Sequence, residues 1–222
     1  MAARGYLTTS DRSYLKLAAH YRSRLREHGD KALGLDWPRE ADNRRRFAVM
    51  AGLFAADRAK RVSVLDFGCG TSHFYGFLKE SGLARRVAYS GIDIGPEAVA
   101  LSLRKYPRND CRCFDVLSST EPLGSYDYAV INGVFTQKRE MTDARMRSFL
   151  VRVLTRLYPC VRRGLAFNTM SDQVDFRRRG SFHLDLGWAA RMLTERFTRN
   201  FVVRHDYGLY ENTFYLFKGE RR

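Results

Sequence analysis

From residue 62 onward, short runs of β-forming residues alternate with segments of helical periodicity, and this alternation limits the possible fold more than any other feature. Strands are expected at residues 62–67, 87–93, 111–116, 126–131, 165–168, 201–205 and 213–217. Strands joined through helices pair in parallel, whereas the last two have no helix between them and should form an antiparallel hairpin at the sheet edge. The sequence therefore predicts an α/β fold with a doubly wound sheet of seven strands.

The first 61 residues contain no expected strand. Apolar residues from Tyr14 to Leu25 recur at helical spacing, and a second helix is expected at residues 41–59. Gly29, Gly34 and the Trp37-Pro38 pair should separate the two helices. We expect these residues to form a helical N-terminal cap over residues 1–61, followed by an α/β domain over residues 62–222.

Composition is ordinary for a globular chain of 222 residues, with 45% hydrophobic and 28% charged residues. No apolar run reaches the length of a membrane span or a signal peptide, which makes a cytoplasmic location the expectation. The four cysteines are too few for a disulfide scaffold and lack zinc-site spacing, so we expect reduced thiols and no metal.

The chain is strongly basic, with 39 Lys and Arg residues against 24 Asp and Glu and a net charge of +15. Such a field attracts phosphates, nucleic acid or acidic small molecules. The excess is spread along the chain and not gathered into one tail, which favours a solvated surface over a dedicated binding patch.

Glycine and acidic residues follow the expected strands, where open α/β sheets bind their ligands. The first strand leads into Asp66-Phe67-Gly68-Cys69-Gly70, whose glycines let backbone N–H groups approach a ligand closely. Asp93 ends the second strand and can accept hydrogen bonds from both hydroxyls of a ribose. Asp115, expected at the end of the third strand, could accept from an adenine amino group. Asn132-Gly133-Val134-Phe135 follows the fourth strand, where a reacting atom would lie.

Two nucleoside cofactors compete for such a site. A dinucleotide fingerprint needs a third glycine three positions after the second, and position 73 is a histidine. S-adenosylmethionine has no pyrophosphate, so a loop with two glycines and acids for its ribose and adenine is sufficient. The pattern favours S-adenosylmethionine.

With these motifs in this order, the chain resembles the class I S-adenosylmethionine-dependent methyltransferases, whose fold is Rossmann-like. The resemblance rests on Val64–Gly70, Gly91–Ile94, Phe114–Val116 and Tyr126–Gly133, and covers roughly residues 62–217. It implies a methyltransferase domain over residues 62–222 whose cofactor-binding residues are Asp66, Gly68, Cys69, Gly70, Asp93, Ile94, Asp115, Val116, Asn132 and Gly133. The chain departs from the family at Ser72, where many members have a third glycine, and Asp66 could instead cap the turn.

The methyl acceptor is less constrained. Asn132-Gly133-Val134-Phe135 lacks the prolines typical of enzymes that methylate base amines, and Cys160 ends a helix, where a buried thiol is expected and not a nucleophile. The overall arrangement resembles small-molecule and saccharide O-methyltransferases of bacterial biosynthetic clusters. We therefore expect O-methylation of a small acidic or sugar-like metabolite. The alternatives are an RNA (tRNA or rRNA) methyltransferase that uses the basic surface, and a cofactor-binding partner subunit without catalysis.

Residues that contact the acceptor are inferred from their position along the chain. His183 is the candidate general base, ahead of His73 and His205. Arg46 and Arg178 could bind a carboxylate or phosphate through their bidentate guanidinium groups. Tyr14 and Tyr21, seven residues apart, could cover the pocket, although core packing of their helix explains them equally well.

Overall fold

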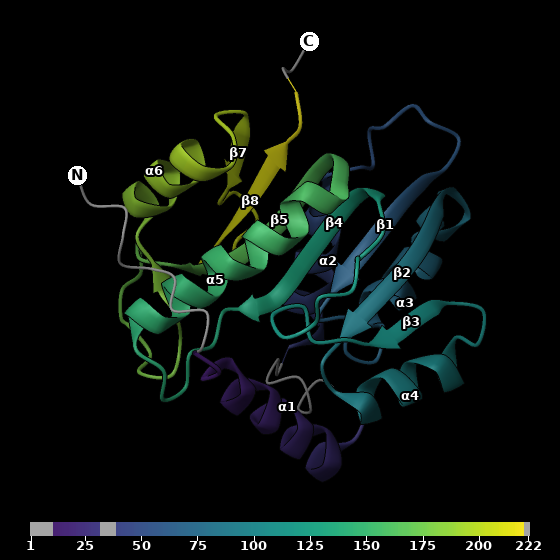
Figure 1. Ribbon diagram of the computed structural model, residues 1–222, viewed down its shortest axis with the longest axis horizontal. Coiled ribbons are helices and arrows are strands. Elements are labelled where there is room, and N and C mark those ends of the chain that lie inside the picture. Colours follow the sequence, from purple (N-terminus) through teal and green to yellow (C-terminus); the bar gives the residue numbers. More distant parts are fainter. Residues whose placement is uncertain (1–10, 32–38, 220–222) are drawn as a thin grey trace.

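The computed structural model describes residues 11–31 and 39–219, so Gly34, Trp37 and Pro38 lie outside the described residues. One mixed sheet forms the centre of the molecule, in the order β3-β2-β1-β4-β5-β8-β7, with the short β6 beside β5 (Figure 1). The strands are β1 (Val62–Phe67), β2 (Val87–Asp93), β3 (Asp110–Cys113), β4 (Tyr126–Phe135), β5 (Val161–Ser171), β6 (His183–Leu184), β7 (Phe201–Arg204) and β8 (Glu211–Phe217). Strand β8 is antiparallel to both of its neighbours, β5 and β7, and the other strand pairs are parallel. The doubly wound sheet and its C-terminal hairpin are confirmed.

Helices cover both faces of this sheet. They are α1 (Tyr14–His28), α2 (Glu40–Gly52), α3 (His73–Glu80), α4 (Pro96–Lys105), α5 (Asp143–Leu157) and α6 (Leu186–Arg196). Apolar side chains of α2, α3 and α4 share one core cluster with one face of the strands, and those of α5 and α6 share a second cluster with the other face. Within the described ranges, no helix is long and apolar enough to cross a membrane.

Several element boundaries differ from the sequence prediction. Helix α2 ends at Gly52 and does not continue to residue 59, because the chain turns there and the Tyr215 ring packs against Gly52. Strand β3 ends at Cys113, which leaves residues 114–116 in the following loop. Strand β4 continues to Phe135, because after an irregularity it pairs again with Thr169 of β5.

Helix α1 lies across the carboxyl ends of the central strands, below the arrowheads of β1, β2 and β4 in Figure 1. Polar contacts hold both ends of this helix. At its start, the Tyr14 hydroxyl donates to Asp115, and just beyond its end Asp30 accepts from Lys105 at 2.6 Å and pairs with His73 at 2.7 Å. The site therefore has the strand ends as its floor and α1 as its roof.

Candidate active site

The turn after β1 requires glycine at its first position. Gly68 has a φ of +72°, and a Cβ placed on it would lie 2.5 Å from a methyl group of Val134. Any larger residue would therefore meet both backbone strain and a steric clash. The absence of a side chain at this position is what allows the glycine loop to pack closely against β4.

Asp93 organises the same loop from the end of β2. Its carboxylate accepts the backbone N–H of Gly70 at 2.8 Å and that of Gly95 at 2.7 Å. Burial raises the pKa of Asp93, although these backbone hydrogen bonds favour its anion. Asp93 thus places a buried carboxylate against the glycine loop.

Ser72 accounts for the departure from the family pattern. It has a left-handed φ of +62°, a backbone conformation that glycine adopts more easily than any other residue. Its hydroxyl oxygen lies 2.6 Å from that of Ser102 and 3.3 Å from that of Tyr89. Tyr89 in turn donates to Asp66 at 2.7 Å. A buried hydrogen-bond network therefore stabilises serine in a backbone conformation that glycine would adopt without strain.

Asp66 is 3% exposed and lies beneath the glycine loop. Burial raises its pKa to about 7, against the opposing effect of the Tyr89 hydrogen bond. Asp66 belongs to this network and also lines the pocket described below.

Asp115 lies in the loop beyond β3, where it contacts α1. It accepts the Tyr14 hydroxyl at 2.8 Å and the Leu117 N–H at 3.0 Å. The Tyr14 ring stacks on Phe149 at a centroid distance of 5.4 Å. Burial and the hydrogen bond to Asp115 raise the pKa of Tyr14 to about 12. Tyr14, predicted to cover the pocket, thus contacts Asp115, the residue expected to bind adenine.

A chain of buried polar groups supports the β4 side of the site. The Gly133 N–H donates to Asn168 Oδ1 at 2.8 Å, and Asn168 Nδ2 donates to Glu211 at 2.8 Å. Arg46 Nε donates to the other oxygen of Glu211 at 2.7 Å. Next to Gly133, the buried Oδ1 of Asn132 has no hydrogen-bond partner among the described residues.

These groups surround one cavity of about 210 Å³ between α1 and the strand ends. Twelve of the fifteen residues predicted from the sequence line it: Tyr14, Tyr21, Asp66, Gly68, Cys69, Gly70, Asp93, Ile94, Asp115, Val116, Asn132 and Gly133. Sequence reasoning missed Phe149 of α5, Glu97 of α4 and most of the α1 wall, including Leu17, Arg22 and Leu25. Two sequence features could have indicated these lining residues: the apolar residues at helical spacing in α1, and the acidic residue that follows Pro96.

Three predicted residues do not line this cavity. Arg46 forms a largely buried ion pair with Glu211, and Arg178 lies 5.9 Å from the ring of Phe176 in the loop after β5. His183 lies on β6, with Nδ1 2.7 Å from the carbonyl oxygen of Ser171. Because a carbonyl only accepts, Nδ1 carries the hydrogen and Nε2 has the free lone pair. Nε2 is buried and has no partner in the part of the chain described.

The cavity fits S-adenosylmethionine in its chemistry. Asp66, Asp93 and Asp115 face a space that would hold a positively charged sulfonium, and apolar side chains of Ile94 and Val116 stand beside them. The unpartnered Asn132 Oδ1 offers one more acceptor. Among the residues that the structure describes, no group of three or more His, Cys, Asp or Glu side chains could hold a metal ion.

Known proteins resemble the chain in sequence and in fold. Residues 65–159 match a methyltransferase domain family. The chain is 28% identical over 158 residues to Rv1506c of Mycobacterium tuberculosis, provisionally named a methyltransferase, which covers 70% of this chain and 92% of that protein.

Two solved structures share the fold. The magnesium protoporphyrin IX methyltransferase of Synechocystis with bound S-adenosylmethionine has a TM-score of 0.63 at 13% identity, over 96% of this chain and 100% of that one. The plantazolicin methyltransferase BpumL, with S-adenosylhomocysteine and a desmethyl substrate analogue, has a TM-score of 0.64 at 13% identity, over 93% and 98%. These two structures show the fold, and together with the domain match and the relative they agree on S-adenosylmethionine-dependent methyl transfer as the activity of the chain.

Proposed function

We propose that the chain transfers the methyl group of S-adenosylmethionine to an oxygen atom of a small acidic or sugar-like metabolite. The observation that carries this proposal is the single cavity in which the glycine loop and the carboxylates of successive strands meet beneath α1. Related folds are named for a porphyrin and for plantazolicin as their methyl acceptors, which supports a small acceptor here.

Within this cavity each strand end would hold one part of the cofactor. The Gly68–Gly70 loop would contact the methionine part, Asp93 the ribose hydroxyls, and Asp115 with Ile94 and Val116 the adenine. The bound cofactor supplies an electrophilic methyl group. Asn132 and Gly133 would then border the acceptor, at the irregularity in β4 where Gly133 is bonded to Asn168. The protein mainly contributes alignment of the acceptor oxygen with that methyl group.

His183 would take the proton of the acceptor hydroxyl. The Ser171 carbonyl fixes the hydrogen on Nδ1, which leaves Nε2 as the basic atom. His183 lies outside the cofactor cavity and its Nε2 is buried, so this role requires the acceptor to extend from the cavity towards β6 and to expose Nε2 as it binds. Arg178, with its guanidinium in the loop between β5 and β6, would bind an acidic group on the acceptor. Arg46 would act indirectly, through Glu211 and Asn168.

Calorimetry with S-adenosylhomocysteine tests the cofactor assignment. We expect Asp93→Asn to weaken binding at least tenfold, because the amide can no longer accept from every donor around it. Asp110→Asn is the matched control, since Asp110 is an exposed carboxylate on the neighbouring strand and accepts a hydrogen bond from the Ser90 hydroxyl. Equal affinities of the two variants would contradict the assignment.

Labelled S-adenosylmethionine tests the acceptor. Incubation with a metabolite extract and, separately, with total RNA should place the label in an acid-soluble small molecule. His183→Gln should lower turnover and leave the affinity for S-adenosylhomocysteine unchanged. Label recovered in RNA would support the alternative acceptor and overturn the proposal.

A further inference from the structure

Two cysteines meet beneath the cofactor loop, although they are 42 positions apart in the sequence. Cys69 lies between the two loop glycines, and Cys111 lies on β3. The point that a Cβ on Gly91 would occupy is 2.8 Å from the sulfur of Cys69 and 2.9 Å from that of Cys111. The two sulfur atoms are therefore at most about 6 Å apart. Glycine at position 91 of the intervening strand is what lets the thiols approach each other.

Cys111 has the surroundings of a reactive thiol. Its sulfur lies 3.4 Å from the Ser102 hydroxyl and 3.6 Å from that of Ser72. Hydrogen bonding from Cys69, and then from these two hydroxyls, lowers the pKa of Cys111. The same contact raises the pKa of Cys69, so Cys111 is the thiol of the pair that loses its proton more readily. A low-pKa thiolate next to a second thiol is the arrangement that peroxide oxidises to a disulfide.

Access to this pair runs through the cofactor cavity. Cys69 lines that cavity and is 7% exposed, and Cys111 directly behind it is 9% exposed. Cys113, two residues further, is exposed, and its sulfur lies 3.6 Å from the Ile94 carbonyl oxygen. A small oxidant could reach the pair when the cavity is open, whereas a bound cofactor would cover it.

We propose that Cys69 and Cys111 are a modification site at which hydrogen peroxide forms a disulfide that disables the cofactor loop. The Cys111 thiolate attacks one peroxide oxygen and becomes a sulfenic acid, releasing hydroxide, which is protonated to water. Cys69 then attacks the Cys111 sulfur, loses its proton and displaces the oxygen as a second water. Overall, two thiols are oxidised to one disulfide and one peroxide is reduced to two waters.

The disulfide would deform the site because it would draw the two sulfur atoms together to about 2 Å and fix the torsion between them. Strand β3 is paired with β2 through Cys111 itself, whereas Cys69 lies in a loop with glycine on both sides. The loop should therefore move, which would disturb the hydrogen bond from Gly70 to Asp93. We expect S-adenosylhomocysteine to bind the oxidised protein at least tenfold more weakly, with recovery after dithiothreitol.

Peptide mapping after peroxide treatment tests the proposal. Trypsin cleaves after Arg112 and so separates Cys111 from Cys113. A Cys113→Ser, Cys160→Ser background removes the other two thiols and any disulfide between chains that they could form. We expect a cross-linked pair of peptides bearing Cys69 and Cys111, together with the loss of affinity. Cys111→Ser in this background should keep its affinity through the same treatment.

Preincubation with S-adenosylhomocysteine should slow the cross-linking severalfold. Protection by the ligand depends on the proposed cofactor site, whereas cross-linking in the absence of ligand does not. Cross-linking without protection would therefore contradict the cofactor site alone, and protein that does not cross-link would contradict the modification site alone. Two mapping results would overturn the modification site: Cys69 and Cys111 both reduced in native protein in which Cys113 is fully oxidised, or a disulfide between Cys69 and Cys113. An unchanged affinity of the cross-linked protein for S-adenosylhomocysteine would overturn it as well.

Discussion

Ser72 has a left-handed backbone that glycine adopts more easily, and its hydroxyl joins the network that contains Asp66. Both residues belong to the floor of the glycine loop, but they contribute differently to stability. At Ser72 the cost of a strained backbone is offset by hydrogen bonds of the side chain. At Asp66 the raised pKa makes the free energy of unfolding depend on pH. Each can be tested by a single substitution.

Replacement of Ser72 should separate strain from hydrogen bonding. Ser72→Ala removes the hydroxyl and keeps the strain, whereas Ser72→Gly removes both. We expect the alanine variant to be the less stable by about 1 kcal/mol, the cost of a left-handed residue that has a Cβ. Urea denaturation measures the difference, and equal stability would show that the φ of +62° is not strained.

Asp66 should make the folded protein less stable as pH rises. Its pKa is about 7 in the folded chain and about 4 in an unfolded one, so the folded state holds the proton more tightly. The stability from protonated Asp66 is complete below about pH 4 and is lost as pH rises towards 7, on the order of 4 kcal/mol in total. Asp66→Asn should lack this loss. Unfolding free energies of both proteins at several pH values check it, and parallel curves would contradict it.

At the scale of elements, α2, β8, β5 and β4 are linked by the polar chain from Arg46 through Glu211 and Asn168 to Gly133. Glu211 is 1% exposed and Asn168 is fully buried, so no water can replace a lost partner without rearrangement. The N-terminal helical region therefore contacts the β4 wall of the site through ordered side chains.

Asn168→Ala should disturb the site as well as the fold. It leaves the Gly133 N–H and one oxygen of Glu211 without a partner, which should cost about 2–3 kcal/mol of stability. We also expect a severalfold higher KM for S-adenosylmethionine, because Gly133 lines the cofactor cavity. Asn200→Ala, at the start of β7, removes an amide remote from that cavity and is the control. An unchanged KM in a destabilised Asn168→Ala protein would limit this asparagine to a structural role.

At the scale of the whole molecule, the strand order and the cavity could be predicted because they depend on local patterns. A strand that ends in Asp93 or in Gly68-Cys69-Gly70 carries its signal within a few residues, and parallel pairing then brings those ends together. Glu211 could not be predicted as the partner of Arg46, because 165 positions separate them and neither lies in a motif. Asp30, which ties α1 to Lys105, was missed for the same reason.

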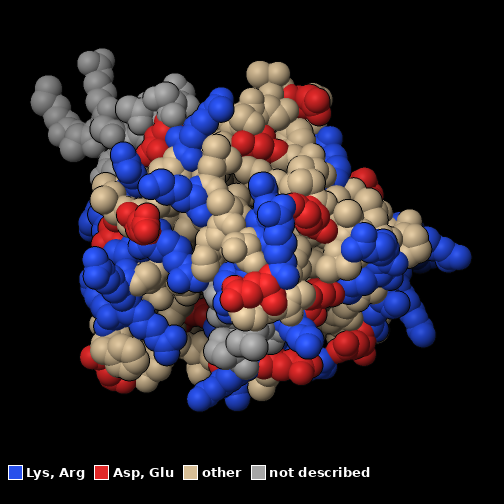
Figure 2. Space-filling model, turned by 90° about the horizontal axis from the view of Figure 1, so that it is seen from below, with Lys and Arg blue, Asp and Glu red and all other residues tan. Residues whose placement is uncertain are grey.

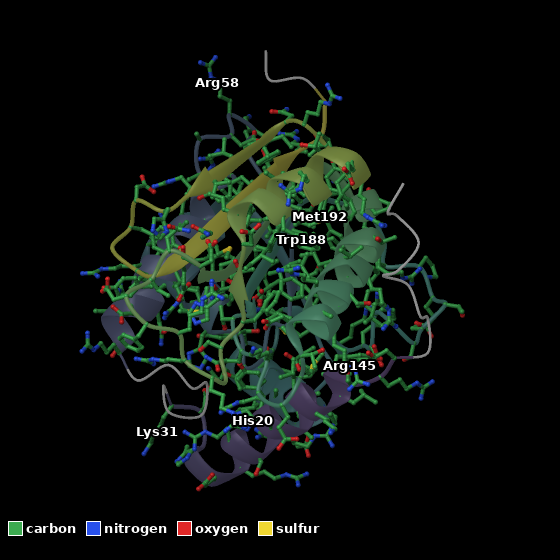
Figure 3. The ribbon with its side chains drawn as sticks, turned by 90° about the vertical axis from the view of Figure 1, so that its left-hand side faces the viewer. His20, Lys31, Arg58, Arg145, Trp188 and Met192 are labelled. Carbon is green, nitrogen blue, oxygen red and sulfur yellow. The ribbon has the colours of Figure 1, made fainter. Side chains whose placement is uncertain are left out.

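The charge of +15 is dispersed over the molecule. Acidic side chains lie between the Lys and Arg side chains on the face at the α1 end (Figure 2). Arg58 and Lys31 point outward at opposite ends of the molecule (Figure 3). Many of the arginines are also paired, as Arg26 is with Glu97 and Arg44 with Glu80. This distribution favours general solvation of the surface over one track for a phosphate backbone.

Salt dependence should therefore distinguish the two acceptor classes. An enzyme that contacts six or more phosphates of RNA loses about three orders of magnitude in affinity between 50 and 200 mM salt, because counterions are no longer released favourably. A small acidic acceptor contacts only one or two cationic groups, so kcat/KM should fall less than about tenfold over the same range. Steady-state kinetics at several salt concentrations measure the slope. A slope as steep as that of RNA binding would mean that the dispersed arginines act together on an extended phosphate chain.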